Sequence, residues 1–256
     1  EVPGESMWPS QPLPVKPPPL VRQRALARSE LSTVTPESQK FCAELFDTLK
    51  SAPMFSPLGL WQTLLFPGTL GGANWSGASF DPSLGYLFVN VNEMGMVGAM
   101  KEQPPDAPVR YRRSSPQGEY ARFEDQNRWP CQQPPWGTLN AVDLNRGEIV
   151  WRVPLGIVEQ LAARGAGNTG TLSLGGTIVT AGGLVFIGGT NDARFRAFDA
   201  RNGRLLWEAR LDAGGHATPV TFLGKKSGKQ FVVIAAGGSG YFSTDVSDAV
   251  VAFSLK

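Results

Sequence analysis

The sequence predicts an all-β protein built from the blades of a β-propeller. Its most informative feature is an internal repeat, in which the pattern A-x-D-x-x-x-G-x-x-x-W over residues 141–151 recurs over residues 197–207. Each copy has the composition of a strand, a tight turn containing Asp and Gly, and a second strand with a Trp at a fixed distance. A regular repeat of β-hairpins is typical of radial β architectures.

Composition supports the same fold class. The chain has 30 glycines and 21 prolines among 256 residues, which favours turn-rich β structure over helix. Apolar residues make up 41% of the chain, enough for a core. Charged residues make up 18% and the net charge is +2, so the composition does not point to a nucleic-acid partner.

Three apolar runs supply the strands of the predicted blades. Residues 183–189 and 231–238 are apolar on both faces and end in glycine, as expected for strands buried between stacked sheets. Residues 85–90 form a third run after an Asp-Pro turn. At this spacing the chain holds roughly three to four four-stranded blades, whereas closed propellers have four to eight. We therefore expect another polypeptide, or another part of the same protein, to cover the apolar edges.

The N-terminal part is expected to lie outside the blades. Residues 1–35 are rich in proline and predict an extended strap, because proline fixes φ and cannot donate a ladder hydrogen bond. A short helix is predicted over residues 36–50, with Thr35 as N-cap and Pro36 at its first position. Cys42 falls on the apolar face of this helix, toward the protein body.

Residues 51–256 are assigned to blades, with one interruption. Residues 101–137 are polar, rich in Arg and Pro, and without periodicity, so we expect an irregular excursion there. The uncharged stretch over residues 169–191 is long enough to cross a bilayer. Repeated glycines indicate two strands and a turn instead, so no membrane span is predicted in this chain.

Several short motifs do not support their usual function. Residues 165–170 match G-x-G-x-x-G, but they follow a helical segment and precede a strand, the reverse of the dinucleotide-binding order. Residues 224–229 resemble a phosphate loop in composition, but Gln230 replaces the Ser or Thr that must reach magnesium, so a hairpin turn is expected. Residues 74–76 form a formal glycosylation sequon in a Gly-rich segment, which favours a turn.

The titratable residues suggest little chemistry by themselves. His216 is the only histidine and lies in a turn-like stretch, which favours a packed loop residue over a general base. Cys42 and Cys131 could form a disulfide, remain unrelated buried thiols, or form half of a metal site. Without a C-x-x-C motif or a histidine cluster, a zinc site is disfavoured.

Beyond these patterns, the whole chain resembles the membrane-bound quinoprotein glucose dehydrogenase family. The residues that carry the resemblance are the motifs FPG at 66–68, GGANWSG at 71–77, PCQQPPWG at 130–137, LGG at 174–176, GLVFI at 183–187, FRA at 195–197, GGHATP at 214–219 and GKQFVVIAAGG at 228–238. Their number and order make the resemblance specific.

The resemblance implies an eight-bladed propeller, of which this chain would be the C-terminal half, around pyrroloquinoline quinone (PQQ). Asn74 matches an amide that hydrogen-bonds the quinone, Trp75 follows it, and Asp192 matches an acidic residue near the axis. The alternatives are a turn role for Asn74, a packing role for Trp75 and a strand-end turn for Asp192. No catalytic residue or metal ligand is expected here, because the family's catalytic aspartate, a lysine and the calcium ligands precede this portion.

The implied function is that of the C-terminal half or smaller chain of a PQQ-dependent dehydrogenase acting on a sugar, polyol or cyclic alcohol. Its expected partners are an N-terminal propeller portion or companion chain carrying the catalytic Asp, and ubiquinone or a cytochrome as acceptor. A periplasmic location at the outer face of the inner membrane is implied, through a partner or another segment, and with it a disulfide between Cys42 and Cys131. After residue 238 the sequence departs from many members, which leaves the substrate open. The alternatives are a non-catalytic scaffold propeller and a sugar-binding propeller.

Overall fold

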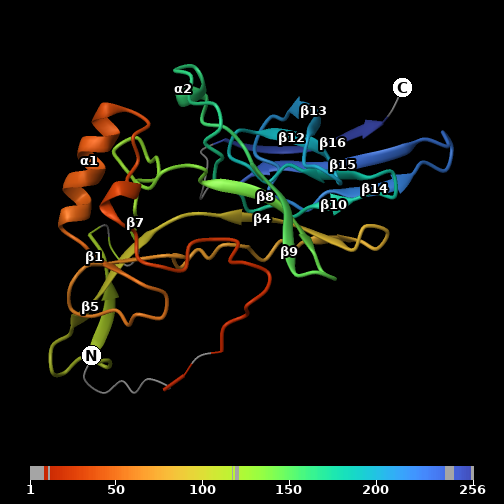
Figure 1. Ribbon diagram of the computed structural model, residues 1–256. Helices are drawn as coiled ribbons and strands as arrows, with labels where there is room; N and C mark the ends of the chain where they lie inside the picture. The colour runs from red at the N-terminus through yellow and green to blue at the C-terminus, as the bar shows by residue number, and fades with distance from the viewer. Residues whose placement is uncertain (1–8, 11, 117, 119–120, 240–244, 255–256) are drawn as a thin grey trace. The chain divides into compact units, whose positions relative to one another are not determined.

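The computed structural model describes residues 9–10, 12–116, 118, 121–239 and 245–254. The chain divides into two compact units, which can be followed by colour in Figure 1. The first unit comprises residues 1–15, 21–72 and 93–134, and the second comprises residues 16–20, 73–92 and 135–256.

The first unit combines a helix with a mixed sheet. Its elements are η1 (Arg28–Glu30), α1 (Pro36–Asp47), β1 (Lys50–Ala52), β2 (Thr63–Leu65), β5 (Met96–Glu102), β6 (Tyr111–Ser114) and β7 (Ala121–Arg122). The sheet order is β1-β2-β5-β6, and β7 also pairs with β5. Only β1 and β2 run parallel among these described strands.

The predicted helix is present and shorter than expected. The hydroxyl oxygen of Thr35 accepts a hydrogen bond from the Ser38 amide at 3.1 Å, and Pro36 occupies the first position, as the sequence predicts. The helix ends at Asp47 rather than at residue 50, because β1 begins at Lys50.

The expectation of an irregular excursion over residues 101–137 is wrong in part. Strand β6 pairs with β5 and strand β7 lies in the same sheet, so this segment completes the first unit. Both strands are short, and β6, at the end of the sheet order, shows no regular alternation in burial. Such strands leave little periodic signal in the sequence.

The second unit contains three antiparallel sheets, each ordered as in the chain. The first sheet is β3 (Ser79–Asp81), β4 (Tyr86–Asn92), β8 (Gly137–Asp143) and β9 (Glu148–Pro154); the second is β10 (Ile178–Val179), β11 (Leu184–Ile187), β12 (Arg194–Asp199) and β13 (Leu205–Arg210); the third is β14 (Val220–Leu223), β15 (Gln230–Gly238) and β16 (Val246–Ser254). A short helix, α2 (Glu159–Ala162), lies between the first and second sheets in sequence. The prediction of propeller blades is confirmed, with two four-stranded sheets among the described residues.

The internal repeat forms the hairpins that the sequence predicts. The amide of Gly147 donates to the Asp143 carbonyl at 2.8 Å, and the amide of Gly203 donates to the Asp199 carbonyl at 2.9 Å. Both glycines have positive φ, 67° and 72°, which explains why glycine recurs at this turn position. Each turn leads into an outer strand, β9 or β13, that carries the repeated Trp.

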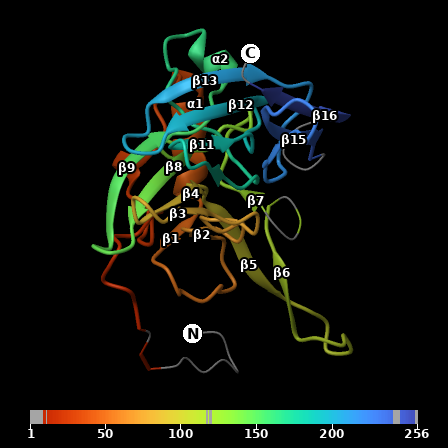
Figure 2. The same ribbon diagram turned by 90° about the vertical axis from the view of Figure 1, so that its right-hand side faces the viewer.

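The three sheets pack against one another in sequence order, and Figure 2 shows the strands of the second and third side by side. One buried cluster, including Phe88, Trp151 and Val185, joins the first sheet to the second. A second cluster, including Phe195 and Ile234, joins the second sheet to the third. This stacking explains why the run 183–189, which contains β11, is apolar on both faces, whereas β15 in the run 231–238 buries only one face against the second sheet.

The three segments whose motif or membrane-span interpretation the sequence disfavoured form turns, loops and strands. The hairpin between β14 and β15 is closed by a hydrogen bond from the Gly228 amide to the Gly224 carbonyl at 2.8 Å. Residues 165–170 follow α2 and lead into a loop, and the uncharged stretch 169–191 contains β10 and β11. In the part of the chain that the structure describes, no helix has the length and apolar character of a membrane span.

Candidate functional site

Asn74 and Trp75 lie on a tight loop that enters the first sheet just before β3. The side-chain oxygen of Asn74 accepts a hydrogen bond from the Trp75 amide at 2.8 Å. The main-chain carbonyl of Asn74 accepts another from the Gly77 amide at 3.4 Å. Gly77 has φ 85°, and a β-carbon there would meet no atom within 4 Å, so open space borders the loop.

The indole of Trp75 projects from this loop into solvent. Trp75 is 86% exposed, whereas Trp136 is 1% and Trp151 is 9% exposed. The described residues therefore leave most of the Trp75 indole in contact with solvent. The packing role weighed for Trp75 therefore receives no support from the described residues of this chain.

Ser76 fastens the loop to two other sheets. The hydroxyl of Thr218 donates to the Ser76 carbonyl at 3.0 Å, and the Ser76 hydroxyl donates to the Leu174 carbonyl. A β-carbon on Gly176 would lie 2.2 Å from the Ser76 carbonyl oxygen, so only glycine allows this approach. Leu174, Gly176 and Thr218 lie on the loops that precede β10 and β14. The entry loops of all three sheets therefore meet at Ser76.

His216 belongs to the same loop as Thr218 and is largely buried. Burial lowers the pKa of His216 below its ordinary value, and a hydrogen bond with the main chain of Gly189 opposes part of that shift. A β-carbon on Gly214 would lie 2.6 Å from the His216 ring, so the ring packs closely against its own loop. This environment agrees with the interpretation of His216 as a packed loop residue.

Asp192 occupies a buried ion pair. Its side chain has no exposed surface, and its carboxylate binds the guanidinium of Arg196, which also binds Glu208 at 2.8 Å. The carboxylate further accepts hydrogen bonds from the Ile157 amide at 2.9 Å and the Thr190 hydroxyl at 2.6 Å. Asp192 lies in the turn before β12, as the strand-end alternative expected, and its pairing with Arg196 was not anticipated. A contact with a cofactor stays a prediction.

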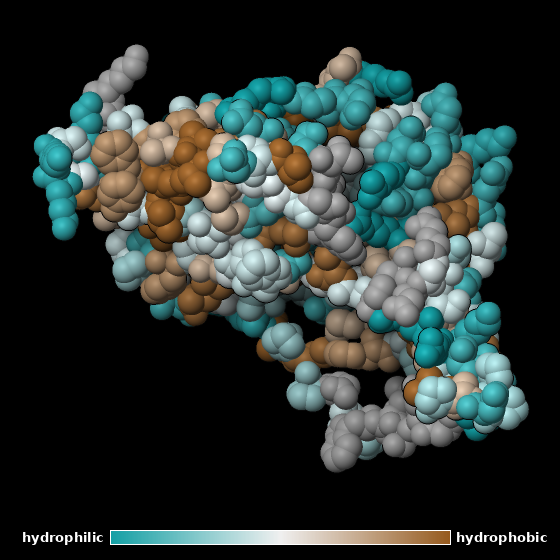
Figure 3. Space-filling view, turned by 180° about the vertical axis from the view of Figure 1, so that it is seen from behind, coloured by the Kyte–Doolittle hydropathy of each residue, from teal (hydrophilic) through white to brown (hydrophobic). Residues whose placement is uncertain are grey.

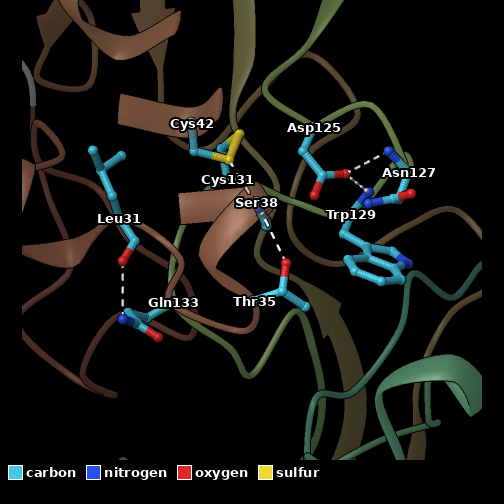
Figure 4. Close-up of a disulfide and its surroundings, with 9 residues drawn as sticks. All are labelled: Leu31, Thr35, Ser38, Cys42, Asp125, Asn127, Trp129, Cys131 and Gln133. Carbon is cyan, nitrogen blue, oxygen red and sulfur yellow. Dashed lines mark hydrogen bonds between the residues drawn. A yellow bond between two sulfur atoms is a disulfide. The ribbon is translucent and has the colours of Figure 1, made fainter. Parts of the chain in front are cut away.

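The two cysteines form a disulfide in the first unit, as the resemblance implies (Figure 4). Cys42 on α1 and Cys131 in the excursion are 89 residues apart in sequence, with Cα atoms 5.2 Å apart. Both are fully buried in the core of the unit. The Cys131 carbonyl accepts a hydrogen bond from the Ser32 amide at 2.8 Å, which ties the strap to the same point.

The contacts of Ser76 with Gly176 and Thr218 were not foreseen from the sequence. The motifs LGG and GGHATP, which contain Gly176 and Thr218, were noted only as marks of family resemblance. Their glycines were a usable signal, because glycine outside a turn often marks a close approach of two backbones. As for metals, no group of three or more His, Cys, Asp or Glu side chains is placed to hold an ion within the described ranges.

Comparison with known proteins identifies relatives over the whole chain. Quinate/shikimate dehydrogenase (quinone) from Acinetobacter baylyi is 34% identical, with 100% of this chain and 34% of the relative covered. Quinoprotein glucose dehydrogenase from Escherichia coli is 35% identical, with 90% and 31% covered. This chain therefore spans about a third of the length of these curated relatives.

A solved structure gives the same result. The quinohemoprotein alcohol dehydrogenase from Comamonas testosteroni superposes with a TM-score of 0.56 at 25% identity, covering 80% of this chain and 29% of that one. Residues 1–232 match the PQQ family described as glucose/ethanol/alcohol dehydrogenase, beta-propeller domain. Together with the blade hairpins and the entry loops that meet at Ser76, this match shows that the chain belongs to the PQQ-dependent dehydrogenase β-propeller family.

Proposed function

We propose that this chain is the C-terminal part, or the smaller chain, of a periplasmic PQQ-dependent dehydrogenase that oxidises a sugar, polyol or cyclic alcohol. The observation that carries the proposal is the uncovered indole of Trp75 beside the Asn74 amide, on a loop held at the entry edges of three blades. The names of relatives support the reaction class, since they include dehydrogenases of quinate, glucose and glycerol.

The chemistry of these two residues fits a planar quinone. An amide can donate to a quinone oxygen or carboxylate without titrating, and the exposed face of an indole can stack on a flat ring. The open space beside Gly77 leaves room for a group next to the loop. When bound, PQQ supplies the acceptor for the electrons of the alcohol.

The role of this chain in that reaction would be to bind and orient the cofactor. We propose Asn74 and Trp75 as direct contacts, and Asp192 as a further contact whose fully buried carboxylate would have to be uncovered and shared with Arg196. The catalytic aspartate and the calcium ligands would come from a portion of the protein outside this chain. The acceptor would be ubiquinone or a cytochrome, as the names of relatives ending in "(quinone)" and "(cytochrome c)" suggest.

The C-terminal sheet supports the proposal of a companion portion. The first two sheets each have a fourth, outer strand, β9 or β13, which carries Trp151 or Trp207. The third sheet has three strands, and among the described residues no fourth strand pairs with β16. Trp151 is 9% exposed and Trp207 is 38% exposed. Trp207 lines an apolar pocket with Phe253, where a further strand and turn would cover it.

The open face of the same sheet is also apolar. Val220, Phe222 and Val250 are 57%, 51% and 71% exposed, and Figure 3 shows apolar surface over the part of the molecule that carries β14–β16. Because the opposite face packs on the second sheet, we propose that this face receives the next blade of the propeller. The disulfide is consistent with the proposed periplasmic location, since such bonds persist in oxidising compartments.

The proposal is tested by titrating PQQ into the complete apo-protein and into variants of the loop. The Asn74→Ala variant should weaken binding by about 1–3 kcal/mol, the contribution of a hydrogen bond with a buried partner. The Trp75→Ala variant should also bind less tightly, while Trp61→Ala, which removes a 49% exposed Trp in the first unit, serves as control. If the protein does not bind PQQ or reduce a dye with an alcohol substrate, the scaffold or sugar-binding alternative replaces this proposal.

A further inference from the structure

Thr218 is the point at which the third sheet holds the loop of Asn74 and Trp75. Its hydroxyl donates to the Ser76 carbonyl at 3.0 Å across 142 residues of sequence. Thr218 lies one residue before Pro219 and two before β14, so its main chain is part of the third sheet's entry. The contact therefore links the position of the loop to that of a separate blade.

The geometry around Ser76 leaves the loop few alternatives. The Ser76 hydroxyl donates to the Leu174 carbonyl on one side, and the Thr218 hydroxyl reaches the Ser76 carbonyl on the other. A β-carbon on Gly176 would lie 2.2 Å from the Ser76 carbonyl oxygen and 2.8 Å from the Thr218 hydroxyl oxygen. The segments of Ser76 and Gly176 approach through their main chains, and the hydroxyls of Ser76 and Thr218 join all three segments, so a shift of one requires a shift of the others.

The restraint acts directly beside the proposed cofactor contacts. Ser76 follows Trp75, and the loop closes on the Asn74 side chain and carbonyl through the Trp75 and Gly77 amides. Because Trp75 is 86% exposed, no described part of the chain covers the indole and holds it in place. Its direction depends on the main chain that carries it, which Ser76 fixes.

We propose that Thr218 is a positioning residue for the PQQ site, which acts by fixing the main chain of the Asn74–Trp75 loop. This inference rests on the proposed function. It assigns a role to the GGHATP segment that does not require its histidine to react. The residue itself is exposed and makes its contribution through the Ser76 carbonyl.

The test compares Thr218→Val, which keeps the shape and removes the hydroxyl, with Thr218→Ser, which keeps the hydroxyl. In the complete protein, Thr218→Val should weaken PQQ binding two- to tenfold, the net contribution of one hydrogen bond, and Thr218→Ser should restore it. In the apo-protein, Thr218→Val should speed hydrogen exchange of the Trp75 and Gly77 amides severalfold. Unfolding temperature should stay near that of the parent protein.

The matched control is Thr221→Val. Thr221 is also exposed, and its hydroxyl donates to the Phe231 carbonyl at 2.8 Å within the third sheet. This variant should leave both the PQQ dissociation constant and the exchange of the Trp75 amide unchanged. Equal effects of the two variants would show a general loss of sheet stability and overturn the inference.

A double variant separates positioning from a remote structural effect. If Thr218 acts through the loop, Thr218→Val should change PQQ binding less in an Asn74→Ala background than in the parent, because the contact that it positions is absent. If Thr218→Val changes the PQQ binding free energy by the same amount in both backgrounds, the inference is overturned. If Asn74→Ala weakens binding and Thr218→Val does not, only the role of Thr218 fails; if neither variant changes binding, the proposed cofactor site fails with it.

Discussion

The indole nitrogen of Trp151 donates a hydrogen bond to the main-chain carbonyl of Ala200 at 3.0 Å. This bond fixes the outer strand of the first sheet to the turn of the second. The ring also lies against Gly203, where a β-carbon would approach a Trp151 carbon to 2.7 Å. Trp151 of the first repeat and Gly203 of the second are therefore two halves of one contact between neighbouring blades.

The steric part of this contact can be measured with two glycine variants. Gly203→Ala should destabilise the protein more than Gly228→Ala, although both glycines have similar φ, 72° and 66°. A β-carbon at Gly228 meets nothing within 4 Å, so that variant reports about 1–2 kcal/mol of backbone strain alone. Gly203→Ala should cost about 1–3 kcal/mol more because it overpacks Trp151. Equal losses in denaturant unfolding would contradict the contact.

The disulfide should stabilise the first unit. Replacing Cys42 and Cys131 together by Ala should lower the unfolding free energy by about 2–5 kcal/mol, because the bond closes a loop of 89 residues. Thermal unfolding with and without dithiothreitol checks this expectation. The reductant should lower the transition of the parent protein and leave that of the double variant where it is. A parent protein insensitive to complete reduction would refute the prediction.

Asp192 offers a test between a structural and a cofactor role. Asp192→Asn should destabilise the second unit by about 1–3 kcal/mol, because it removes one of the two carboxylates that pair with the buried guanidinium of Arg196 and leaves only Glu208. Adding Arg196→Met should recover part of that loss. PQQ titration of the folded double variant then reports on the cofactor role, and an unchanged dissociation constant would remove Asp192 from the site.

His216 should make stability fall as the solution becomes acidic. Its pKa in the folded protein is lowered by burial, so below its ordinary value of about 6.5 the unfolded chain binds the proton more readily. The stabilisation is therefore present above that pH and is lost as pH falls toward the lowered pKa. His216→Gln should reduce this dependence of the unfolding free energy on pH. The measurement is the difference in unfolding free energy between pH 7.5 and pH 5.5, which lie about one unit either side of the ordinary histidine pKa. If the parent protein and the variant lose the same unfolding free energy between these two pH values, His216 is not the source of the acid sensitivity.

The open face of the third sheet should govern association with the remaining propeller. Val250→Glu places a charge on an apolar surface that is proposed to be covered, so it should reduce recovery of the assembled protein after co-expression. Leu144→Glu is the control, because Leu144 is 52% exposed in the β8–β9 turn rather than on that face. Equal yields, measured by size exclusion, would argue against the proposed surface.

Much of the blade architecture was available from the sequence. The hairpins at Gly147 and Gly203 were visible because each depends on hydrogen bonds within five residues, which leave a periodic trace. The helix start at Thr35 and Pro36 was visible for the same reason. The strands β6 and β7 within the excursion were not predicted, since they are stabilised by pairing with β5 rather than by a pattern of their own.

In the candidate site, too, some features could be predicted from the sequence and others depend on contacts between distant segments. Asn74, Trp75 and Asp192 could be named from sequence because the family resemblance assigns each to a matching position. The meeting of Ser76 with Thr218 could not, because 142 residues separate the partners and nothing in either segment specifies the other. Sequence by itself determined the strand periodicity, the turns and the family. The tertiary structure alone decided which entry loops touch, because that depends on how whole sheets stack, a sum of many weak contacts that no single segment encodes.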